Sequence, residues 1–289
     1  MLHCPPPVAD ARATELVEQL AAALHGQAIA VLTGAGCSTE SGIPDYRGPE
    51  TRRRARSPIR FAEFERDENA RKRYWARAVI GYQRFQRKLP NAAHHALVQF
   101  EAAGLLTGLI TQNVDDLHER AGQQHVIPLH GSLSQVRCLR CELRLPRAEL
   151  QMQLETLNPH WKHVPGAMAP DGDADIPDAA VARFQVVDCP RCAGALKPAV
   201  VFFGENVPPQ RVAAAYEICD NADVLFVIGS SLMVFSGYRF VRRAAEQGKP
   251  IVILNVGESR GDPLSTLRVA APAGQLLPPL FRRLTCLAL

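Results

Sequence analysis

The sequence lacks any long apolar run. Its longest uninterrupted stretches of apolar residues span five positions, for example residues 224–228, whereas a membrane-spanning helix needs about 18 or more. Residues 1–10 include three consecutive prolines and show neither the basic start, the apolar stretch nor the small-residue cleavage site of a secretory signal. These absences predict a cytoplasmic protein without a membrane partner.

Neither sign of charge dominates. Lys and Arg number 33 against 29 Asp and Glu, and the net charge of +4 gives no reason to expect a specific nucleic-acid partner. Apolar residues make up 47% and charged residues 21%, which excludes disorder, collagen-like repeats and coiled coils. The length of 289 residues suits one large domain, or one with a smaller satellite. A monomer is the default expectation.

Short apolar runs of strand length alternate with stretches of helical spacing. Leu16, Val17, Leu20 and Leu24 predict a first helix, and Gly26 follows where a left-handed C-terminal cap belongs. The predicted strands are residues 28–33, 109–111, 126–129, 200–203, 224–228 and 251–254. The pattern indicates an α/β fold with a Rossmann-like, doubly wound parallel sheet.

Two segments interrupt this alternation. Residues 48–90 are rich in Arg and aromatic side chains, and residues 132–197 contain paired cysteines. We therefore expect a discontinuous nucleotide-binding domain formed by residues 10–47, 91–131 and 198–286. Residues 48–90 and 132–197 are expected to form a smaller domain, a helical insertion plus a metal-binding ribbon.

The paired cysteines have the spacing of a zinc site. Cys138 and Cys141 form one C-x-x-C pair, and Cys189 and Cys192 form the other, so four thiolates can meet one tetrahedral ion. A redox pair is the alternative, but neither pair opens a helix after a strand. Since no open coordination position is indicated, we predict one structural zinc. The remaining cysteines are interpreted as buried or incidental thiols: Cys4, Cys37, Cys219 and Cys286.

A glycine-rich turn follows the first strand. Gly34, Ala35 and Gly36, with the hydroxyls of Ser38 and Thr39, supply N–H and O–H donors where a dinucleotide pyrophosphate docks. Thr39 occupies the third glycine position of the dehydrogenase fingerprint, and arginines replace the ribose-binding carboxylate expected near residue 55, which disfavours an ordinary NAD dehydrogenase. The alternative to a nucleotide site is a tight turn that binds no ligand. The arginines near residue 55 suit a solvated surface loop or a mobile lid.

Polar side chains follow the other predicted strands. His130 ends one apolar run, and its unperturbed pKa near 6.5 suits a general base, although a buried structural histidine is equally compatible with that position. Asn113 and Asp115 suit either a ligand pocket or helix capping. The other strand-end residues are Gln112, Gly229, Ser230, Ser231, Asn255 and Gly257.

Several of these motifs together resemble the sirtuins, which are NAD-dependent protein lysine deacylases. The first is the contiguous segment of residues 34–47, which ends in Asp45, Tyr46 and Arg47. Matching motifs follow in the same order at residues 111–115, 129–131, 201–205, 229–232 and 254–255. The resemblance spans about residues 10–285. Cys37, where sirtuins usually carry Ile or Phe, and Asp116, where a small residue is common, depart from the pattern.

The resemblance implies roles for individual residues. His130 is the general base, which accepts a proton from the nicotinamide ribose after the acyl oxygen has attacked the anomeric carbon. Asn113 is the second expected catalytic residue, and with Asp115 and Asp45 it shapes the nicotinamide pocket. Arg47 lies beside the ribose and phosphates. The loops of residues 229–231 and 255–257 hold the adenosine half. Val201, Phe202, Phe203 and Gly204 pair with the substrate peptide and line the acyl-lysine tunnel, although an ordinary core strand is the alternative for their side chains.

The implied products are nicotinamide, O-acyl-ADP-ribose and free lysine, with an acyl-lysine protein or peptide as substrate partner and NAD consumed. Tyr46 and residues 157–159 and 169–173 most resemble class II, which contains the fourth mammalian mitochondrial sirtuin. No Tyr and Arg pair supports a preference for acidic acyl groups, and the loop of residues 157–175 favours acyl groups longer than acetyl. The alternatives are protein mono-ADP-ribosyl transfer and a non-catalytic zinc-ribbon binding module.

Overall fold

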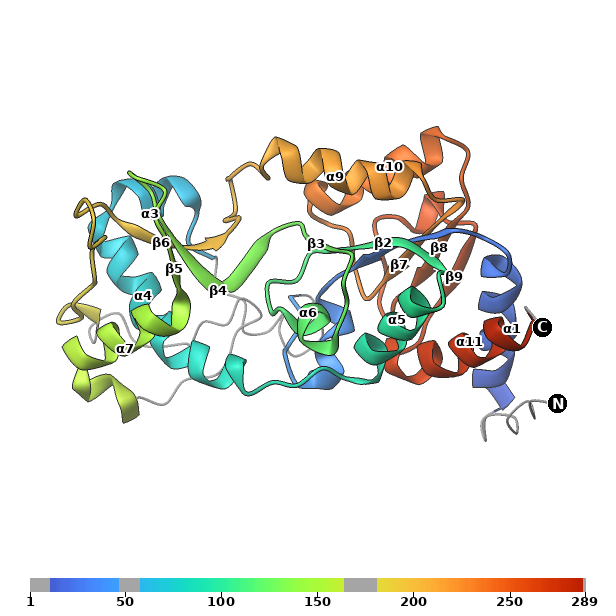
Figure 1. Cartoon of the computed structure of the whole chain (residues 1–289), viewed down its shortest axis with the longest axis horizontal. Helices are drawn as coiled ribbons and strands as arrows, with labels where there is room; N and C mark the ends of the chain where they lie inside the picture. The colour runs from blue at the N-terminus through green and yellow to red at the C-terminus, as the bar shows by residue number, and fades with distance from the viewer. Residues whose placement is uncertain (1–10, 47–57, 164–180, 288–289) are drawn as a thin grey trace.

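The computed structural model describes residues 11–46, 58–163 and 181–287. It contains two sheets, which lie in separate bodies along the long axis of the molecule (Figure 1). The larger sheet has six parallel strands, and the smaller has three antiparallel strands. The predicted α/β fold with a Rossmann-like parallel sheet is confirmed.

The six-stranded sheet has the order β3-β2-β1-β7-β8-β9. Its strands are β1 (Ile29–Thr33), β2 (Leu106–Thr111), β3 (Val126–Pro128), β7 (Val224–Ile228), β8 (Ile251–Leu254) and β9 (Leu267–Val269). The chain winds outwards in one direction from β1 and in the other from β7. Strand order therefore reverses between β1 and β7, and such a switch point opens a crevice at the carboxyl ends of the strands.

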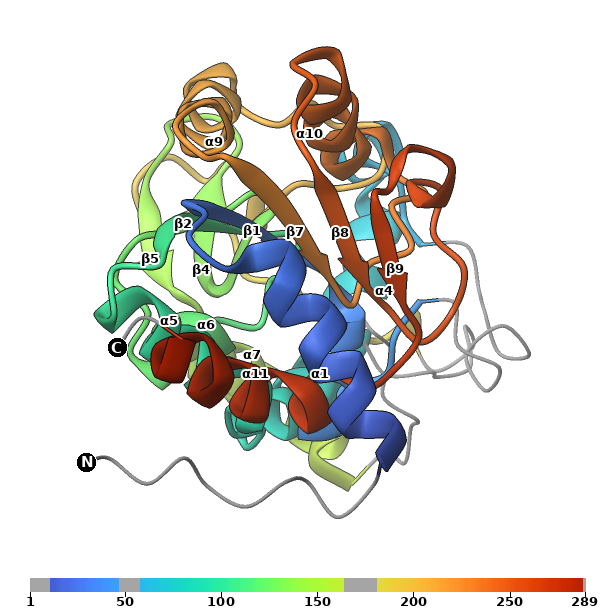
Figure 2. The same ribbon diagram turned by 90° about the vertical axis from the view of Figure 1, so that its right-hand side faces the viewer.

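Helices cover both faces of this sheet (Figure 2). One face packs against α1 (Ala11–Leu24), α5 (Ala92–Ala102) and α11 (Ala273–Leu287), and the other against α9 (Pro209–Asp220) and α10 (Phe235–Glu246). Val31 belongs to the first core and Leu32 to the second. Because both faces are buried, β1, β7 and β8 are continuous apolar runs, which is why the sequence reveals them.

The smaller body has its own sheet and core. Its strands, in the order β5-β4-β6, are β4 (Gly131–Cys138), β5 (Arg144–Pro146) and β6 (Leu196–Val200). Its helices are α3 (Phe61–Arg66), α4 (Glu68–Gln86) and α7 (Arg147–Leu157). Phe64, Trp75 and Leu154 are buried in its core, and the Trp75 indole donates a hydrogen bond to the Leu196 carbonyl at 3.1 Å. The exact domain boundaries stay a prediction.

Short helices complete the chain: η1 (Ala35–Cys37), η2 (Thr39–Ser41), α6 (Leu117–Ala121), η3 (Pro159–His163) and η4 (Asp262–Leu264). The first helix ends as predicted, with Gly26 in the left-handed region at φ +72°. Throughout the described ranges, every helix is too short or too polar to cross a membrane.

The structure corrects one predicted strand and adds an edge strand to the parallel sheet. The predicted strand at residues 200–203 is wrong, because the strand is β6, which ends at Val200 and belongs to the antiparallel sheet. The apolar character of that segment has another origin, since the Phe202 ring packs 5.2 Å from the rings of Phe64 and Tyr74. The edge strand β9 was missed because it has three residues and its Arg268 is exposed, so no apolar run marks it.

Candidate active site and metal centre

A cavity of about 1350 Å³ opens at the carboxyl ends of the parallel strands, and residues of both bodies line it. It brings together every predicted cofactor and substrate residue that the structure describes. These are Gly34, Ala35, Gly36, Ser38, Thr39, Asp45, Tyr46, Gln112, Asn113, Asp115, His130, Val201, Phe202, Phe203, Gly204, Gly229, Ser230, Ser231, Asn255 and Gly257. Arg47 lies outside the described residues. The roles assigned to the individual side chains stay predictions.

The glycine-rich turn sits against the loop that follows β7. The Gly34 N–H donates to the Ile228 carbonyl at 3.0 Å, and the Gly36 N–H donates to the Gly229 carbonyl at 2.8 Å. Gly229 has φ +62°, and a Cβ there would lie 2.3 Å from the Cys37 nitrogen. Only glycine permits this approach. The two strand-end loops of the switch point are thus held in direct contact at the cavity wall.

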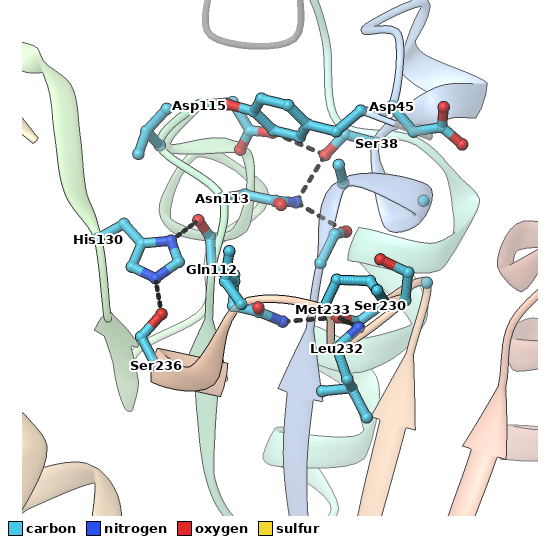
Figure 3. Close-up of a pocket in the computed structure, with 18 of the residues that line it drawn as sticks. Ser38, Asp45, Gln112, Asn113, Asp115, His130, Ser230, Leu232, Met233 and Ser236 are labelled. Carbon is cyan, nitrogen blue, oxygen red and sulfur yellow. Dashed lines mark hydrogen bonds between the residues drawn. The ribbon is translucent and has the colours of Figure 1, made fainter. Parts of the chain in front are cut away.

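A polar network joins this turn to the end of β2. The Ser38 hydroxyl donates to Asp115 Oδ2 at 2.7 Å, and Asn113 Nδ2 donates to the Ser38 hydroxyl and the Gly34 carbonyl, each at 3.1 Å (Figure 3). The other Asp115 oxygen accepts from the Leu117 N–H at 3.0 Å, at the start of α6. Asp115 therefore supports a helix and the cavity wall at once. Burial raises the pKa of this carboxyl group.

His130 is held at both ring nitrogens. Its Nδ1 lies 2.9 Å from the Gln112 carbonyl and its Nε2 lies 2.8 Å from the Ser236 hydroxyl (Figure 3). A carbonyl can only accept, so Nδ1 carries the proton and Nε2 of the neutral ring is an acceptor. Burial lowers the pKa of His130 to about 4, with Arg211 adding to the effect. The ring is therefore neutral at pH 7, with a lone pair available for general base catalysis.

The loops after β7 and β8 also line the cavity. Gln112 Nε2 donates to the Ser230 hydroxyl at 2.8 Å, which ties the end of β2 to the loop after β7. Asn255 Nδ2 donates to the Gly257 carbonyl at 2.7 Å. The cavity wall therefore combines the imidazole with small polar loops, a lining that suits a polar ligand such as a dinucleotide.

Residues 201–204 leave β6 along the cavity and are anchored by a buried ion pair. The Val201 N–H donates to the His130 carbonyl at 2.7 Å. The Phe202 N–H donates to Glu205 Oε2 at 2.9 Å, and the same oxygen lies 2.9 Å from Nζ of the fully buried Lys197. Phe202 is 9% exposed and belongs to the small core, whereas Phe203 is 43% exposed. Phe202 is therefore a core residue that also lines the cavity.

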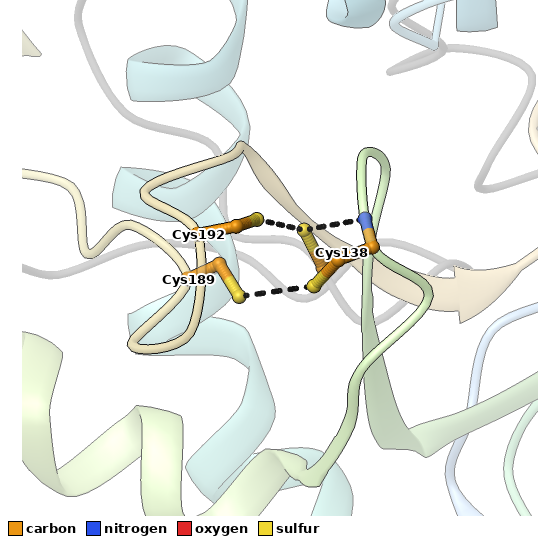
Figure 4. A group of neighbouring side chains, drawn as sticks. Cys138, Cys189 and Cys192 are labelled. Atoms are coloured by element: carbon orange, nitrogen blue, oxygen red, sulfur yellow. Dashed lines mark hydrogen bonds between the residues drawn. The ribbon is translucent and has the colours of Figure 1, made fainter.

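The four paired cysteines meet in the smaller body (Figure 4). The Sγ atoms lie 3.5 Å apart for Cys138 and Cys192 and 3.6 Å apart for Cys141 and Cys189, and all four are free thiols within 4.8 Å of one another. Ligands about 2.3 Å from one tetrahedral zinc stand about 3.8 Å apart. The quartet thus fits a single zinc ion, as predicted.

The surroundings favour the thiolate at Cys141, whereas burial raises the pKa of Cys192 to about 12. A backbone hydrogen bond from Leu143 is the main cause that lowers the pKa of Cys141 to about 6, and the Arg191 side chain adds to it. A Cβ at Gly194 would lie 3.1 Å from the Cys138 sulfur and 3.2 Å from the Cys192 sulfur. Only glycine leaves room for the sulfurs here. The strand β4 runs from directly after His130 to Cys138, so the metal centre anchors the strand next to the candidate base.

Sequence reasoning missed Ser236, which contacts His130, and the aromatic wall contributed by Tyr74. Tyr74 lies on α4, outside the predicted motifs. Ser236 lies on the first turn of α10, where a serine alone carries no signal for a contact with a residue 106 positions away. The neighbouring Gly237 indicates that α10 packs closely against Gln112, since a Cβ at Gly237 would lie 2.4 Å from Gln112 Oε1.

Comparison with known proteins agrees with this geometry. A profile of the Sir2 family matches residues 34–236. An NAD-dependent protein deacetylase from Xanthomonas axonopodis pv. citri (strain 306) is 53% identical over 251 residues, which cover 87% of this chain and 86% of the relative. A solved Sir2–p53 peptide–NAD+ complex superposes with a TM-score of 0.69 at 27% identity, covering 93% of this chain and 95% of the other. A Sir2 variant with deacetylated p53 peptide and 3'-O-acetyl ADP ribose gives 0.74 at 29% identity, covering 91% and 96%.

Proposed function

This chain belongs to the Sir2 family, the sirtuins, and we propose that it is an NAD-dependent protein lysine deacylase that uses His130 as its general base. The relative at 53% identity is named for this activity. The observation that carries the proposal is the neutral imidazole of His130, whose Nε2 is a hydrogen-bond acceptor at the cavity wall. His130 and the glycine-rich turn line the same cavity at the carboxyl ends of the parallel strands.

The cavity suits NAD as a consumed substrate. NAD supplies an electrophilic sugar carbon as nicotinamide leaves, and the carbonyl oxygen of the acyl-lysine is the nucleophile. Asn113 and Asp115 line the cavity, and residues 229–231 and 255–257 suit the adenosine half. His130 Nε2 takes the proton of a ribose hydroxyl, with its ring fixed through Nδ1 on the Gln112 carbonyl. Water then attacks the acyl carbon and displaces the lysine amine, so the products of NAD, acyl-lysine and water are nicotinamide, O-acyl-ADP-ribose and free lysine.

The test compares His130→Ala with a matched control, His125→Ala. The side chain of His125 is 80% exposed and does not line the cavity. Each protein is incubated with NAD and acyl-lysine peptides, and nicotinamide and O-acyl-ADP-ribose are followed by mass spectrometry. Loss of a general base costs about 100-fold or more in rate, so His130→Ala falls by at least that factor while His125→Ala matches the wild type.

The outcomes separate the alternatives. Full turnover by His130→Ala contradicts the assigned base. ADP-ribosylated protein without acyl product favours the mono-ADP-ribosyltransferase, and the absence of nicotinamide release with every peptide favours the non-catalytic zinc-ribbon module. O-acyl-ADP-ribose formed by the wild type supports the deacylase.

We further propose that the chain is a class II sirtuin, like the fourth mammalian mitochondrial sirtuin, and prefers acyl groups longer than acetyl. Tyr46 lines the cavity. Asn158, 5% exposed, accepts from the Gln185 N–H at 2.8 Å and donates to the Gln185 carbonyl at 2.9 Å, which joins the start of the loop of residues 157–175 to the chain that follows it. Residues 169–173 lie outside the described part. A kcat/KM for acetyl-lysine equal to or above that for hexanoyl- and decanoyl-lysine peptides contradicts the acyl preference.

We also propose a cytoplasmic location, because thiolate metal ligands and buried free thiols such as Cys219 persist in a reducing compartment. Cell fractionation followed by immunoblotting tests this location, and recovery in a membrane or extracellular fraction contradicts it. The monomeric state and the lack of nucleic-acid and membrane partners stay predictions.

A further inference from the structure

Three buried side chains gather behind the glycine-rich turn, outside the cavity. Cys37 ends η1, His94 lies in the first turn of α5, and His118 lies on α6. Cys37 and His94 are 0% exposed and His118 is 1% exposed. One ligand atom from each, the Cys37 sulfur and a ring nitrogen of each histidine, lies within 4.8 Å of the other two. The two imidazole centroids are 4.7 Å apart and the rings are tilted by 55°.

Each imidazole is held by one nitrogen and leaves the other without a partner. His118 Nε2 lies 2.9 Å from the Thr33 hydroxyl, which itself donates to Thr111 Oγ1 at 2.9 Å. Thr33 therefore accepts from His118, and Nδ1 of the neutral ring keeps its lone pair. Among the described residues, neither His118 Nδ1 nor His94 Nε2 has a hydrogen-bond partner. A buried polar atom without a partner is destabilising, which favours a ligand at these two nitrogens.

His94 Nδ1 faces two groups of Asn91. It lies 3.0 Å from Asn91 Oδ1 and 3.2 Å from the Asn91 nitrogen, whose N–H donates to it in the capping box of α5. An ion bound at Nε2 requires the other tautomer, in which Nδ1 carries the proton and donates to Asn91 Oδ1. A ligating histidine usually donates its second N–H to a nearby oxygen, which fixes its tautomer. His118 has the same arrangement, with Thr33 as the oxygen. Burial lowers the pKa of both rings, so both are neutral, as ligation requires.

We propose that Cys37, His94 and His118 form a second metal site, which binds a soft transition-metal ion, Cu+ or Zn2+, through one thiolate and two imidazole nitrogens. Thiolate and imidazole are the ligands that both ions prefer. Binding forms one metal–sulfur and two metal–nitrogen bonds and releases the thiol proton to solvent, with no change of oxidation state. Cu+ is the better match to this fully buried site. It accepts three ligands, and its single positive charge is cancelled by the thiolate, whereas an uncompensated charge is costly to bury.

The charges around Cys37 are consistent with a cation at this position. Burial raises the pKa of the Cys37 thiol, and Asp115 and Glu40 raise it further, so the thiol is protonated when no cation is bound. Negative groups that oppose a thiolate favour a cation. Cys37 also precedes Ser38, which donates to Asp115 in the cavity wall. An ion here joins the glycine-rich turn to α5 and α6.

The site is tested by counting metal in wild-type protein, Cys37→Ser and Cys219→Ser. Serine keeps the volume of cysteine and replaces a soft ligand by a poor one. Cys219 is another buried thiol, 3% exposed, in the core on the opposite face of the sheet. Each protein is produced in medium with added zinc or, in a separate arm, added copper, and zinc and copper per chain are measured by mass spectrometry.

The expected result is two metal ions per chain for wild type and Cys219→Ser and one for Cys37→Ser. Two zinc ions identify Zn2+, and one zinc plus one copper identify Cu+. One ion per wild-type chain in both arms overturns the proposal, as does copper that enters only with an equal loss of zinc, because it has displaced the cysteine quartet.

A second measurement guards against a misfolded variant. X-ray absorption of copper in the wild type is expected to show one sulfur and two nitrogen neighbours, whereas a sulfur-only shell overturns the assignment. The metal count needs no acyl substrate and no turnover, so it is independent of whether the chain proves to be a deacylase.

Discussion

The Ser236 hydroxyl lies 2.8 Å from His130 Nε2, the ring nitrogen that must accept a proton during catalysis. Nδ1 is tied to the Gln112 carbonyl at 2.9 Å, so the serine holds the ring at its reactive end. Its O–H donates to the lone pair and must yield when a ribose hydroxyl arrives. Ser236 is thus a positioning residue, which orients the base before the substrate does.

Ser236→Ala is expected to lower kcat/KM about five-fold, because a hydrogen bond contributes about 1 kcal/mol net and Gln112 still holds the ring. Steady-state deacylation kinetics measure it, and the NAD dissociation constant is expected to stay unchanged. Ser134→Ala, at an exposed position of β4, is the control. A loss as large as that of His130→Ala contradicts a purely positioning role, and rates equal to the wild type contradict any role.

The lowered pKa of His130 predicts a pH dependence of stability. The folded-state pKa of about 4 lies below the unfolded value near 6.5. The unfolded chain therefore binds the proton more readily, and the stabilisation present above pH 6.5 is lost as the pH falls towards 4. The loss amounts to about 3 kcal/mol for this ring, at about 1.4 kcal/mol per pKa unit.

This pH dependence is measured by urea unfolding of the wild type and His130→Gln between pH 4 and 8. Glutamine does not titrate, so its unfolding free energy is expected to fall less steeply below pH 6.5. Parallel curves for the two proteins contradict the assigned pKa. The kcat/KM of the wild type is expected to show no ionisation of this base between pH 6 and 8.

Glu205 is expected to control the substrate segment through Lys197. Burial lowers the pKa of Lys197 to about 8, and the Glu205 carboxylate limits that fall. Because removal of one partner leaves a buried charge uncompensated, Glu205→Gln is expected to reduce the unfolding free energy by about 3 kcal/mol. The Phe202 N–H also loses a carboxylate acceptor, so the peptide KM is expected to rise more than the KM for NAD.

Glu142→Gln is the matched control for Glu205. Both carboxylates contact Arg137, but the Glu142 side chain is 65% exposed and the Glu205 side chain 13%. An exposed pair contributes about 1 kcal/mol or less. Thermal melting and peptide kinetics compare the two variants, and equal effects contradict a special role for the buried pair.

The sequence was most informative where one local pattern dictates the structure. Continuous apolar runs revealed β1, β7 and β8, because both faces of these strands are buried. The cysteine spacing predicted the quartet, since its four ligands lie in two local C-x-x-C pairs. His130 and its neighbours converge in the cavity because parallel strands end at one edge.

Contacts between distant segments were beyond reach. Ser236 meets His130 across 106 positions, and the Cys37 cluster joins three separate helices, so neither leaves a local pattern. The apolar run at residues 200–203 was wrongly predicted to be a strand. Its apolar character comes from the burial of Phe202 beside Phe64, and such a run looks the same in the sequence as a strand of the main sheet. Apolar character shows that a segment is buried but not which core buries it.

Loss of the zinc quartet is expected to weaken catalysis through β4. Cys141→Ser should bind one metal ion fewer than the wild type and lower the melting temperature, because metal binding contributes to the folding of a small ribbon. Since β4 begins directly after His130, loss of order in β4 should displace His130 and lower the rate of deacylation. Cys286→Ser, on α11, is the control and should retain both metal content and activity. Metal analysis, thermal melting and turnover are measured on the same samples. Full activity in a Cys141→Ser protein that has lost its zinc contradicts a structural coupling between the metal centre and the cavity.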